Sequence, residues 1–134
     1  MQNNITVWSG KFDLRDETFS HIFTNVVLRK LLLIITDKLN AHPVANIGHI
    51  KGLCTGHDKD YLKINFVSDS DGVVLSGVWN HKPKTTVLTL NVIAMFIAPQ
   101  DLKEIIYEAV RIIEGFCTVI IVPKPERSPF LVLT

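Results

Sequence analysis

The sequence predicts an α+β fold, in which a mostly antiparallel sheet carries two helices packed on one face. Two segments show apolar residues at helical spacing, and several others show the alternation of a half-buried strand. The expected order is β-α-β-β-β-β-α-β, which is related to a ferredoxin-like split βαβ with an added hairpin. With 134 residues and 47% hydrophobic content, the chain can bury one core. We therefore expect a single domain over residues 1–134.

The first helix is expected between residues 16 and 39. Asp16 and Glu17 at its start would favour the helix dipole. His42-Pro43 would end it, because proline disfavours the helical conformation in the residue before it. Its apolar surface is wider than one stripe, which predicts burial on more than one side. The apolar residues at helical spacing are Phe19, Ile22, Phe23, Val26, Val27, Leu31, Ile34 and Ile35.

The remaining elements are expected to be short strands and one further helix. A strand over residues 5–8 should precede the first helix and end at Ser9-Gly10. The segment 123–134 is interpreted as a Pro-rich C-terminal tail. The other expected strands are residues 45–54, 61–67, 73–79, 85–97 and 119–122, and the second helix should begin at Pro99 and stop at Gly115.

Composition and charge exclude several classes of function. The formal net charge of +1 predicts no overall attraction to nucleic acid or to anionic lipid. No run reaches the roughly 18 apolar residues of a membrane helix. Residues 1–4 lack the basic start and apolar run of a signal peptide, and two cysteines do not form a disulfide framework. A cytoplasmic location is therefore expected, without nucleic-acid or membrane partners.

The tract from residue 42 to residue 60 holds the residues most suited to metal binding. His49, Cys54 and His57 are suitable ligands for a divalent transition metal such as zinc. On a regular strand His49 and Cys54 would point to opposite faces, because five positions is an odd step, unless a bulge at Gly52 realigns them. The alternative is a hydrogen-bonded sheet histidine, a small core cysteine and a solvated loop histidine.

The same tract offers a second candidate set for ligand binding, formed by His49, Lys51 and Asp58. Lys51 lies two positions from His49, so both should share one strand face, where the lysine could reach a phosphate or carboxylate. The three residues could also serve proton transfer in a small enzyme. The alternative is a surface lysine beside a solvated hairpin connection. The sequence contains no Gly-rich phosphate loop and no nucleophile motif.

One short sequence motif resembles that of a known family. Ile47-Gly48-His49-Ile50-Lys51-Gly52, followed by the strand Leu90 to Ile97 and a helix with Asp101-Leu102 at its start, is similar to the C-terminal domain of CobW-type metallochaperone GTPases. The similarity covers about residues 45–114. The GTPase half and its cysteine-rich metal motif are absent, so GTP hydrolysis is not implied. The resemblance implies a small α+β module that assists metal or cofactor handling, with Lys51 as the matching position.

Three functions follow from these patterns. The first is a non-catalytic accessory or interaction domain that associates with a protein partner or with itself. It is motivated by the wide apolar surface of the first helix, the long strand 85–97 and the apolar tail Phe130 to Leu133. The second is a metal- or small-ligand-binding protein centred on His49, Cys54 and His57. The third is a small enzyme.

Overall fold

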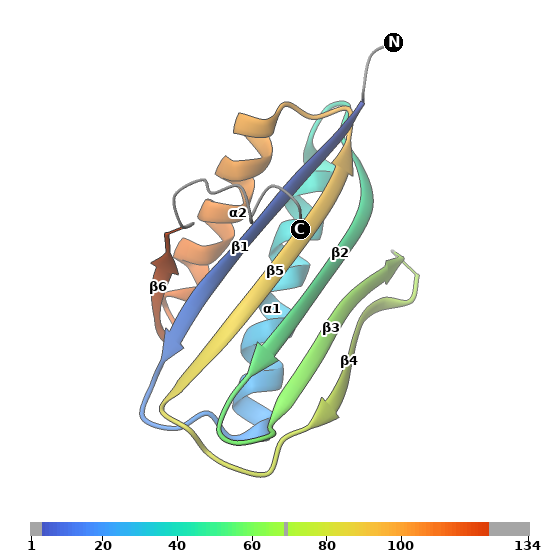
Figure 1. Cartoon of the computed structure of the whole chain (residues 1–134). Helices are drawn as coiled ribbons and strands as arrows, with labels where there is room; N and C mark the ends of the chain where they lie inside the picture. Colours follow the sequence, from blue (N-terminus) through green and yellow to red (C-terminus); the bar gives the residue numbers. More distant parts are fainter. Residues whose placement is uncertain (1–3, 69, 124–134) are drawn as a thin grey trace, which may run out of the picture.

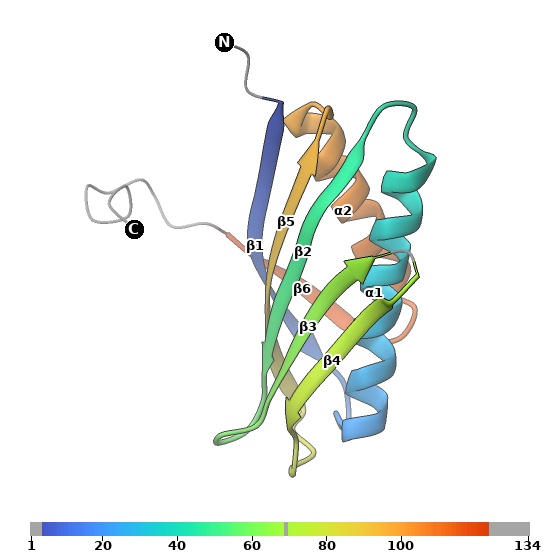
Figure 2. The same cartoon turned by 90° about the vertical axis from the view of Figure 1, so that its right-hand side faces the viewer.

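The computed structural model describes residues 4–68 and 70–123, and it confirms the predicted α+β order. Figure 1 shows the sheet with both helices behind it. Figure 2, turned by 90°, shows that the two helices lie on the same side. The elements are β1 (Ile5–Arg15), α1 (His21–Ala41), β2 (Asn46–Thr55), β3 (Tyr61–Ser68), β4 (Gly72–Val78), β5 (Thr85–Met95), α2 (Pro99–Ile113) and β6 (Thr118–Val122).

The six strands form one sheet in the order β4-β3-β2-β5-β1-β6, and each neighbouring pair is antiparallel. Without the β3–β4 hairpin, the chain is a β-α-β-β-α-β unit of the ferredoxin-like kind, so the predicted added hairpin is confirmed. Strand β5 lies between β1 and β2, which means that its backbone is paired on both sides. The long strand β5 is therefore not an edge strand, and its backbone cannot pair with a strand of a partner protein.

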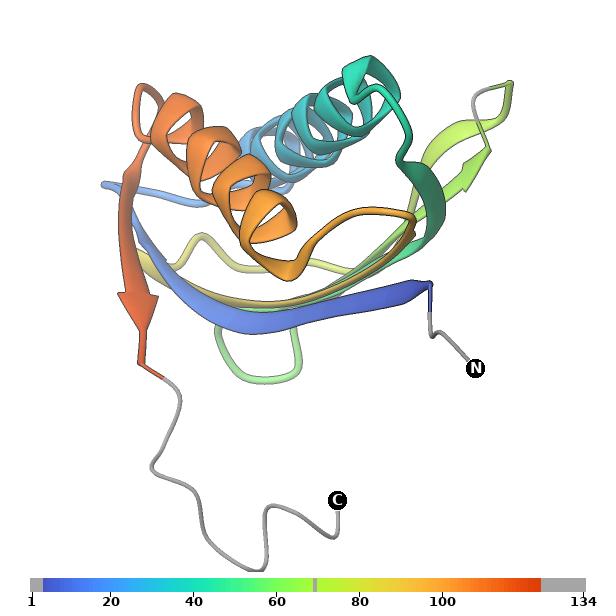
Figure 3. The same ribbon diagram turned by 90° about the horizontal axis from the view of Figure 1, so that it is seen from above.

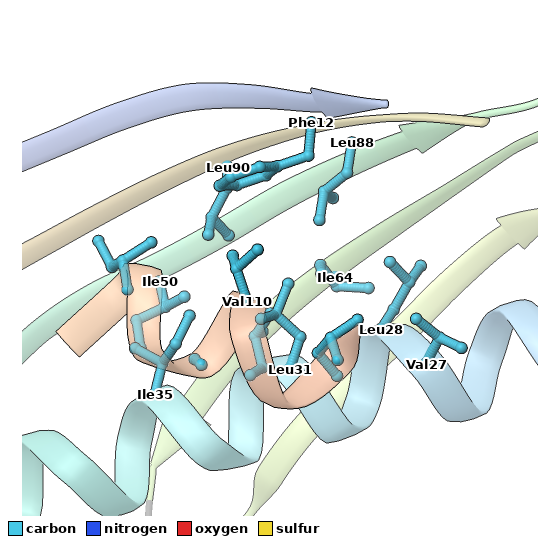
Figure 4. Close-up of a cluster of buried hydrophobic side chains, with 14 of the residues drawn as sticks. Phe12, Val27, Leu28, Leu31, Ile35, Ile50, Ile64, Leu88, Leu90 and Val110 are labelled. Atoms are coloured by element: carbon cyan, nitrogen blue, oxygen red, sulfur yellow. The ribbon is translucent and has the colours of Figure 1, made fainter. Parts of the chain in front are cut away.

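The core fills the space between the helices and one face of the sheet. Figure 3 shows that the sheet curves around the two helices and that its other face carries no helix. Figure 4 shows core side chains from α1, α2 and the strands β1, β2, β3 and β5 meeting in this space. The fully buried large side chains include Phe12, Phe19, Leu28, Leu32, Ile35, Leu39, Ile50, Leu62, Ile64, Leu88, Leu90 and Leu102.

Helix α1 begins at His21, five residues later than predicted. The hydroxyl of Ser20 accepts a hydrogen bond from the amide of Phe23 at 3.1 Å, which caps the first turn. Residues before the cap are instead held by the β4–β5 connection, because the amide of Phe19 donates to the carbonyl of Pro83 at 2.7 Å. The predicted end of the helix at His42-Pro43 is confirmed, since the last helical residue is Ala41 and His42 is the C-cap.

The wide apolar surface of α1 is only partly buried. Its inner side packs against the sheet and α2, and Lys38 joins α2 through an ion pair of 2.9 Å with Glu108. Ile22, Val26 and Leu33 remain exposed, with 78%, 50% and 42% of their surface accessible. The expectation of burial on more than one side therefore holds for the residues that face the sheet and α2, and it fails for these three.

Strand β1 continues to Arg15, so its predicted end at Ser9-Gly10 was wrong. Gly10 lies inside the strand and not in a turn. The indole ring of Trp8 packs closely against its backbone, and a Cβ atom at this position would overlap the ring. The Trp8 ring lies along the strand and stacks on Phe12, with ring centroids 5.7 Å apart. The absent side chain at position 10 thus makes room for an aromatic ring on the helix side of the sheet.

We expect Gly10→Ala to destabilise the fold by about 1–3 kcal/mol, because the new methyl group displaces the Trp8 ring from its stack. The free energy of unfolding from urea denaturation measures this change. In a Trp8→Leu background the same substitution should cost clearly less, since the ring that it displaces has been removed. Equal costs in the two backgrounds would show that Trp8 is not the cause.

Candidate functional site: the open face of the sheet

Strand register decides which of the predicted site residues meet. His49 lies opposite Ile93 and Lys51 lies opposite Asn91, so both point to the face without helices, as predicted. A register shift between Ile47 and His49 places a bulge at Gly48. The bulge considered from the sequence was at Gly52, four positions further along the strand. His49 and Lys51 therefore share the open face of the sheet, by which we mean its helix-free side.

Cys54 lies on the opposite side of the sheet. It is fully buried in the core, where burial raises the pKa of its thiol to about 12. A thiol in this state is protonated at neutral pH, so it is a poor nucleophile and a poor metal ligand. The structure therefore does not bring Cys54 to the face that carries His49.

His57 and Asp58 occupy the β2–β3 connection. Asp58 adopts a left-handed backbone conformation with φ of 58°, which aspartate tolerates in turns. Both side chains are exposed. Six strand positions from His49 to Thr55 span roughly 20 Å at about 3.4 Å per residue, so neither Asp58 nor His57 lies beside His49.

The predicted metal set is consequently not assembled. Within residues 4–68 and 70–123, no three His, Cys, Asp or Glu side chains are grouped so that they could hold a metal ion. The set proposed for proton transfer is separated in the same way, because His49 and Lys51 lie on the sheet whereas Asp58 lies in the connection.

Lys51 has neighbours that the sequence analysis did not single out. Asn65 and Asn91 lie directly opposite it on β3 and β5, and Lys63 is its diagonal neighbour. Together with Thr89 they line a shallow hollow of about 520 Å³ on the open face. Further along this row the Ser9 hydroxyl donates to Asn91 Oδ1 at 2.6 Å. The hollow thus combines two lysines and three neutral hydrogen-bonding side chains with the partly exposed apolar side chain of Leu53.

The charged residues of the open face are predominantly cationic. Strand register places four cationic side chains on this face. It also places the carboxylate of Asp13 there. No ion pair joins any of the four cations to a carboxylate within residues 4–68 and 70–123. The near-neutral chain therefore has a basic face. The cations are Lys11, Arg15, Lys51 and Lys63.

A second polar cluster, at the hairpin end of the sheet, has a structural role. The Asp60 side chain is only 2% exposed, and it accepts hydrogen bonds from the amides of Asn80 and His81 at 2.9 and 2.8 Å. The His81 ring adds a contact of 3.0 Å between Nδ1 and Asp60 Oδ2. The His57 and His81 rings meet edge to face at 4.9 Å. Asp60 therefore fixes the β4–β5 connection.

These contacts set the titration of Asp60. Burial by itself would raise the pKa of the carboxyl, but the hydrogen bonds from Asn80 and His81, together with the charge of the His81 ring, outweigh it and hold the pKa below its usual value. The contact of His81 with Asp60 could not be predicted from the sequence, because 21 positions separate the two residues. The hydrogen bonds exist only once the β3–β4 hairpin has formed.

None of the helices in the described ranges is long and apolar enough to cross a membrane. Comparison of the chain with protein-family models, with curated proteins and with solved structures found no match. The resemblance to the CobW-type C-terminal domain therefore stays a prediction.

We expect the Asp60 contacts to make folding stability depend on pH in the acid range. The pKa is lower in the folded chain than in the unfolded chain, so the unfolded chain takes up the proton first. The stabilisation is fully present above the ordinary aspartate pKa of 3.8, and it is lost as the pH falls through the folded-state value. Urea denaturation of wild type and Asp60→Asn between pH 7 and pH 2.5 measures it, and the variant should lack this part of the decline.

Asp58→Asn is the matched control, because Asp58 is exposed in the neighbouring turn. It should leave the acid dependence unchanged. If Asp60→Asn shows the same decline as the wild type, the carboxylate does not hold the connection in its ionised form.

Proposed function

We propose that this chain is a non-catalytic interaction domain, which presents the open face of its sheet to a partner or ligand bearing phosphate or carboxylate groups. The observation that carries the proposal is the hollow around Lys51 and Lys63, where two cations without an ion pair lie among Asn65, Asn91 and Thr89. The two ammonium groups repel each other, because diagonal neighbours on a sheet lie within reach of long side chains. A bound anion would relieve that repulsion and accept hydrogen bonds from the amides.

The charge on this face also favours one kind of partner over another. A second copy placed face to face would set four cations against four others, with few carboxylates between them. An anionic partner is complementary instead. Self-association thus stays a prediction from the sequence, and the exposed Ile22, Val26 and Leu33 on α1 offer a separate surface for it.

The absence of catalysis in this proposal rests on the state of the thiols. Cys54 is buried in the core, and burial together with the nearby charges of Asp16 and Glu114 raises the pKa of Cys117 to about 11. Neither thiol is a ready nucleophile near neutral pH. The hollow at Lys51 is shallow and open to solvent, which suits binding through several weak contacts. Metal or cofactor handling would then mean holding an anionic carrier on this face.

We expect pyrophosphate and citrate, used as probes, to shift the amide resonances of Lys51, Asn65 and Asn91 in a nuclear magnetic resonance titration. Lys51→Ala and Lys63→Ala should each weaken binding about two- to fivefold, because each removes one exposed cation from the hollow. Binding should also weaken as salt is raised, since these charges are exposed.

Lys82→Ala is the matched control, because Lys82 is an exposed lysine of the β4–β5 connection outside the hollow. It should leave the affinity unchanged. If both probes shift resonances over the whole surface with equal strength, or if Lys82→Ala weakens binding as much as Lys51→Ala, the hollow is not the binding site.

A further inference from the structure

A second surface lies at the edge of the sheet beside β1. Strand β6 pairs with β1 only from Lys11 to Arg15, although β1 begins at Ile5. Among the described strands, Thr6–Gly10 therefore has β5 on one side and no strand on the other. In Figure 3 the short β6 lies beside one half of β1 only.

Backbone groups in this stretch point outward. The amide of Phe96 donates to the carbonyl of Asn4 at 2.9 Å, and Asn4 and Phe96 continue the β1–β5 register. Hydrogen-bonding direction alternates along an antiparallel strand, so the amides and carbonyls of Val7 and Ser9 face the edge that β6 does not reach. This edge can form hydrogen bonds with one more extended chain.

A pocket of about 350 Å³ lies against the same edge, between β1 and α2. Trp8 and Tyr107 form part of its wall, with their rings edge to face at 6.3 Å. The ammonium group of Lys103 lies 5.5 Å from the centre of the Tyr107 ring. Aromatic surface and a cation thus lie immediately beside the outward-facing backbone groups.

The charge of the pocket is one-sided. Lys11 and Lys103 line it, and no Asp or Glu does so within the described residues. Neither lysine has an ion pair in residues 4–68 and 70–123. An occupant with carboxylate side chains would be complementary to both lysines.

From these observations we infer that the Thr6–Gly10 edge and the Trp8–Tyr107 pocket bind an extended acidic peptide of a partner protein by strand addition. Five residues of edge at about 3.4 Å each give roughly 17 Å for main-chain pairing. Alternate side chains of the added strand would lie on the helix side, near Tyr107 and Lys103, and on the open side, near Lys11. This site lies apart from the hollow at Lys51, so it does not rest on the function proposed above.

Other occupants fit less well. A second copy pairing through the same edge would bring its own Lys11 and Lys103 towards the first pair, and like charges repel. A helix would leave the edge groups of Val7 and Ser9 without main-chain partners. An extended acidic segment provides carboxylates for the two lysines and main-chain partners for the edge groups.

The probe is a synthetic octapeptide in which pairs of glutamates alternate with pairs of valines, so that an added strand carries carboxylates on both of its faces. It is titrated while tryptophan emission is recorded. We expect a saturable change in emission that is lost in Trp8→Phe, because Trp8 lines the pocket whereas Trp79 is buried elsewhere. The same octapeptide with lysine in place of each glutamate should not bind. A glutamate–valine peptide with alternate N-methylated amides should bind at least about tenfold more weakly, because it cannot pair with a strand edge.

Two variants of the protein test the charge and the edge separately. Lys103→Glu should weaken binding about tenfold, while the exposed control Lys82→Glu leaves it unchanged. Val7→Pro should also weaken binding about tenfold, since proline removes one outward amide and is tolerated at sheet edges. If Val7→Pro does not fold, as judged by circular dichroism, the N-methylated peptide tests the same hydrogen bonds.

Several results would overturn the inference. They are equal binding of the lysine–valine peptide, equal binding of the N-methylated peptide, or no change in Trp8 emission at millimolar glutamate–valine peptide. If removal of residues 124–134 alone changes Trp8 emission and the peptide then restores the original emission, the occupant is this chain's own C-terminal segment. If emission changes with protein concentration and sedimentation shows a dimer, the occupant is a second copy.

Discussion

The central constraint of this molecule is that both helices cover the same face of a six-stranded sheet. Strand β5 shows how the sequence imposes it, because Leu88, Leu90 and Val92 are completely buried on the helix side. Thr89 and Asn91, at the positions between them, face the other side. Strand β1 alternates in the same way, so that one face of the sheet becomes the core and the other remains exposed.

One-sided coverage also sorts the charges. On the helix side Lys38 pairs with Glu108, and at the hairpin end Asp60 is occupied by hydrogen bonds from its own chain. On the open face Lys51 and Lys63 have neutral neighbours. A formal net charge of +1 therefore conceals a basic surface, because the carboxylates are concentrated elsewhere. Whole-chain charge excluded a strong electrostatic pull, but it could not reveal how the charges are distributed.

The sequence predicted the fold better than the site, and the reason is register. Alternation along residues 61–67 indicates which residues share a face, and the shared face of His49 and Lys51 followed from their spacing of two positions. Partners across strands need the pairing: Asn91 lies opposite Lys51 only because β5 inserts between β1 and β2. Gly10 was misinterpreted because a glycine under an aromatic ring and a glycine in a turn are identical in sequence.

The positions of the reactive groups support the proposed binding function. Catalysis by a thiol or an acid–base pair needs reactive groups together in a site sheltered from water, with their pKa values matched to the task. Here the Cys54 thiol is on the core side with a raised pKa, and the Asp60 carboxylate is fully engaged by the β4–β5 connection. Lysines, amides and a strand edge remain accessible. In the proposed function these groups would act by charge and hydrogen bonding with a partner, which requires no enclosed cavity.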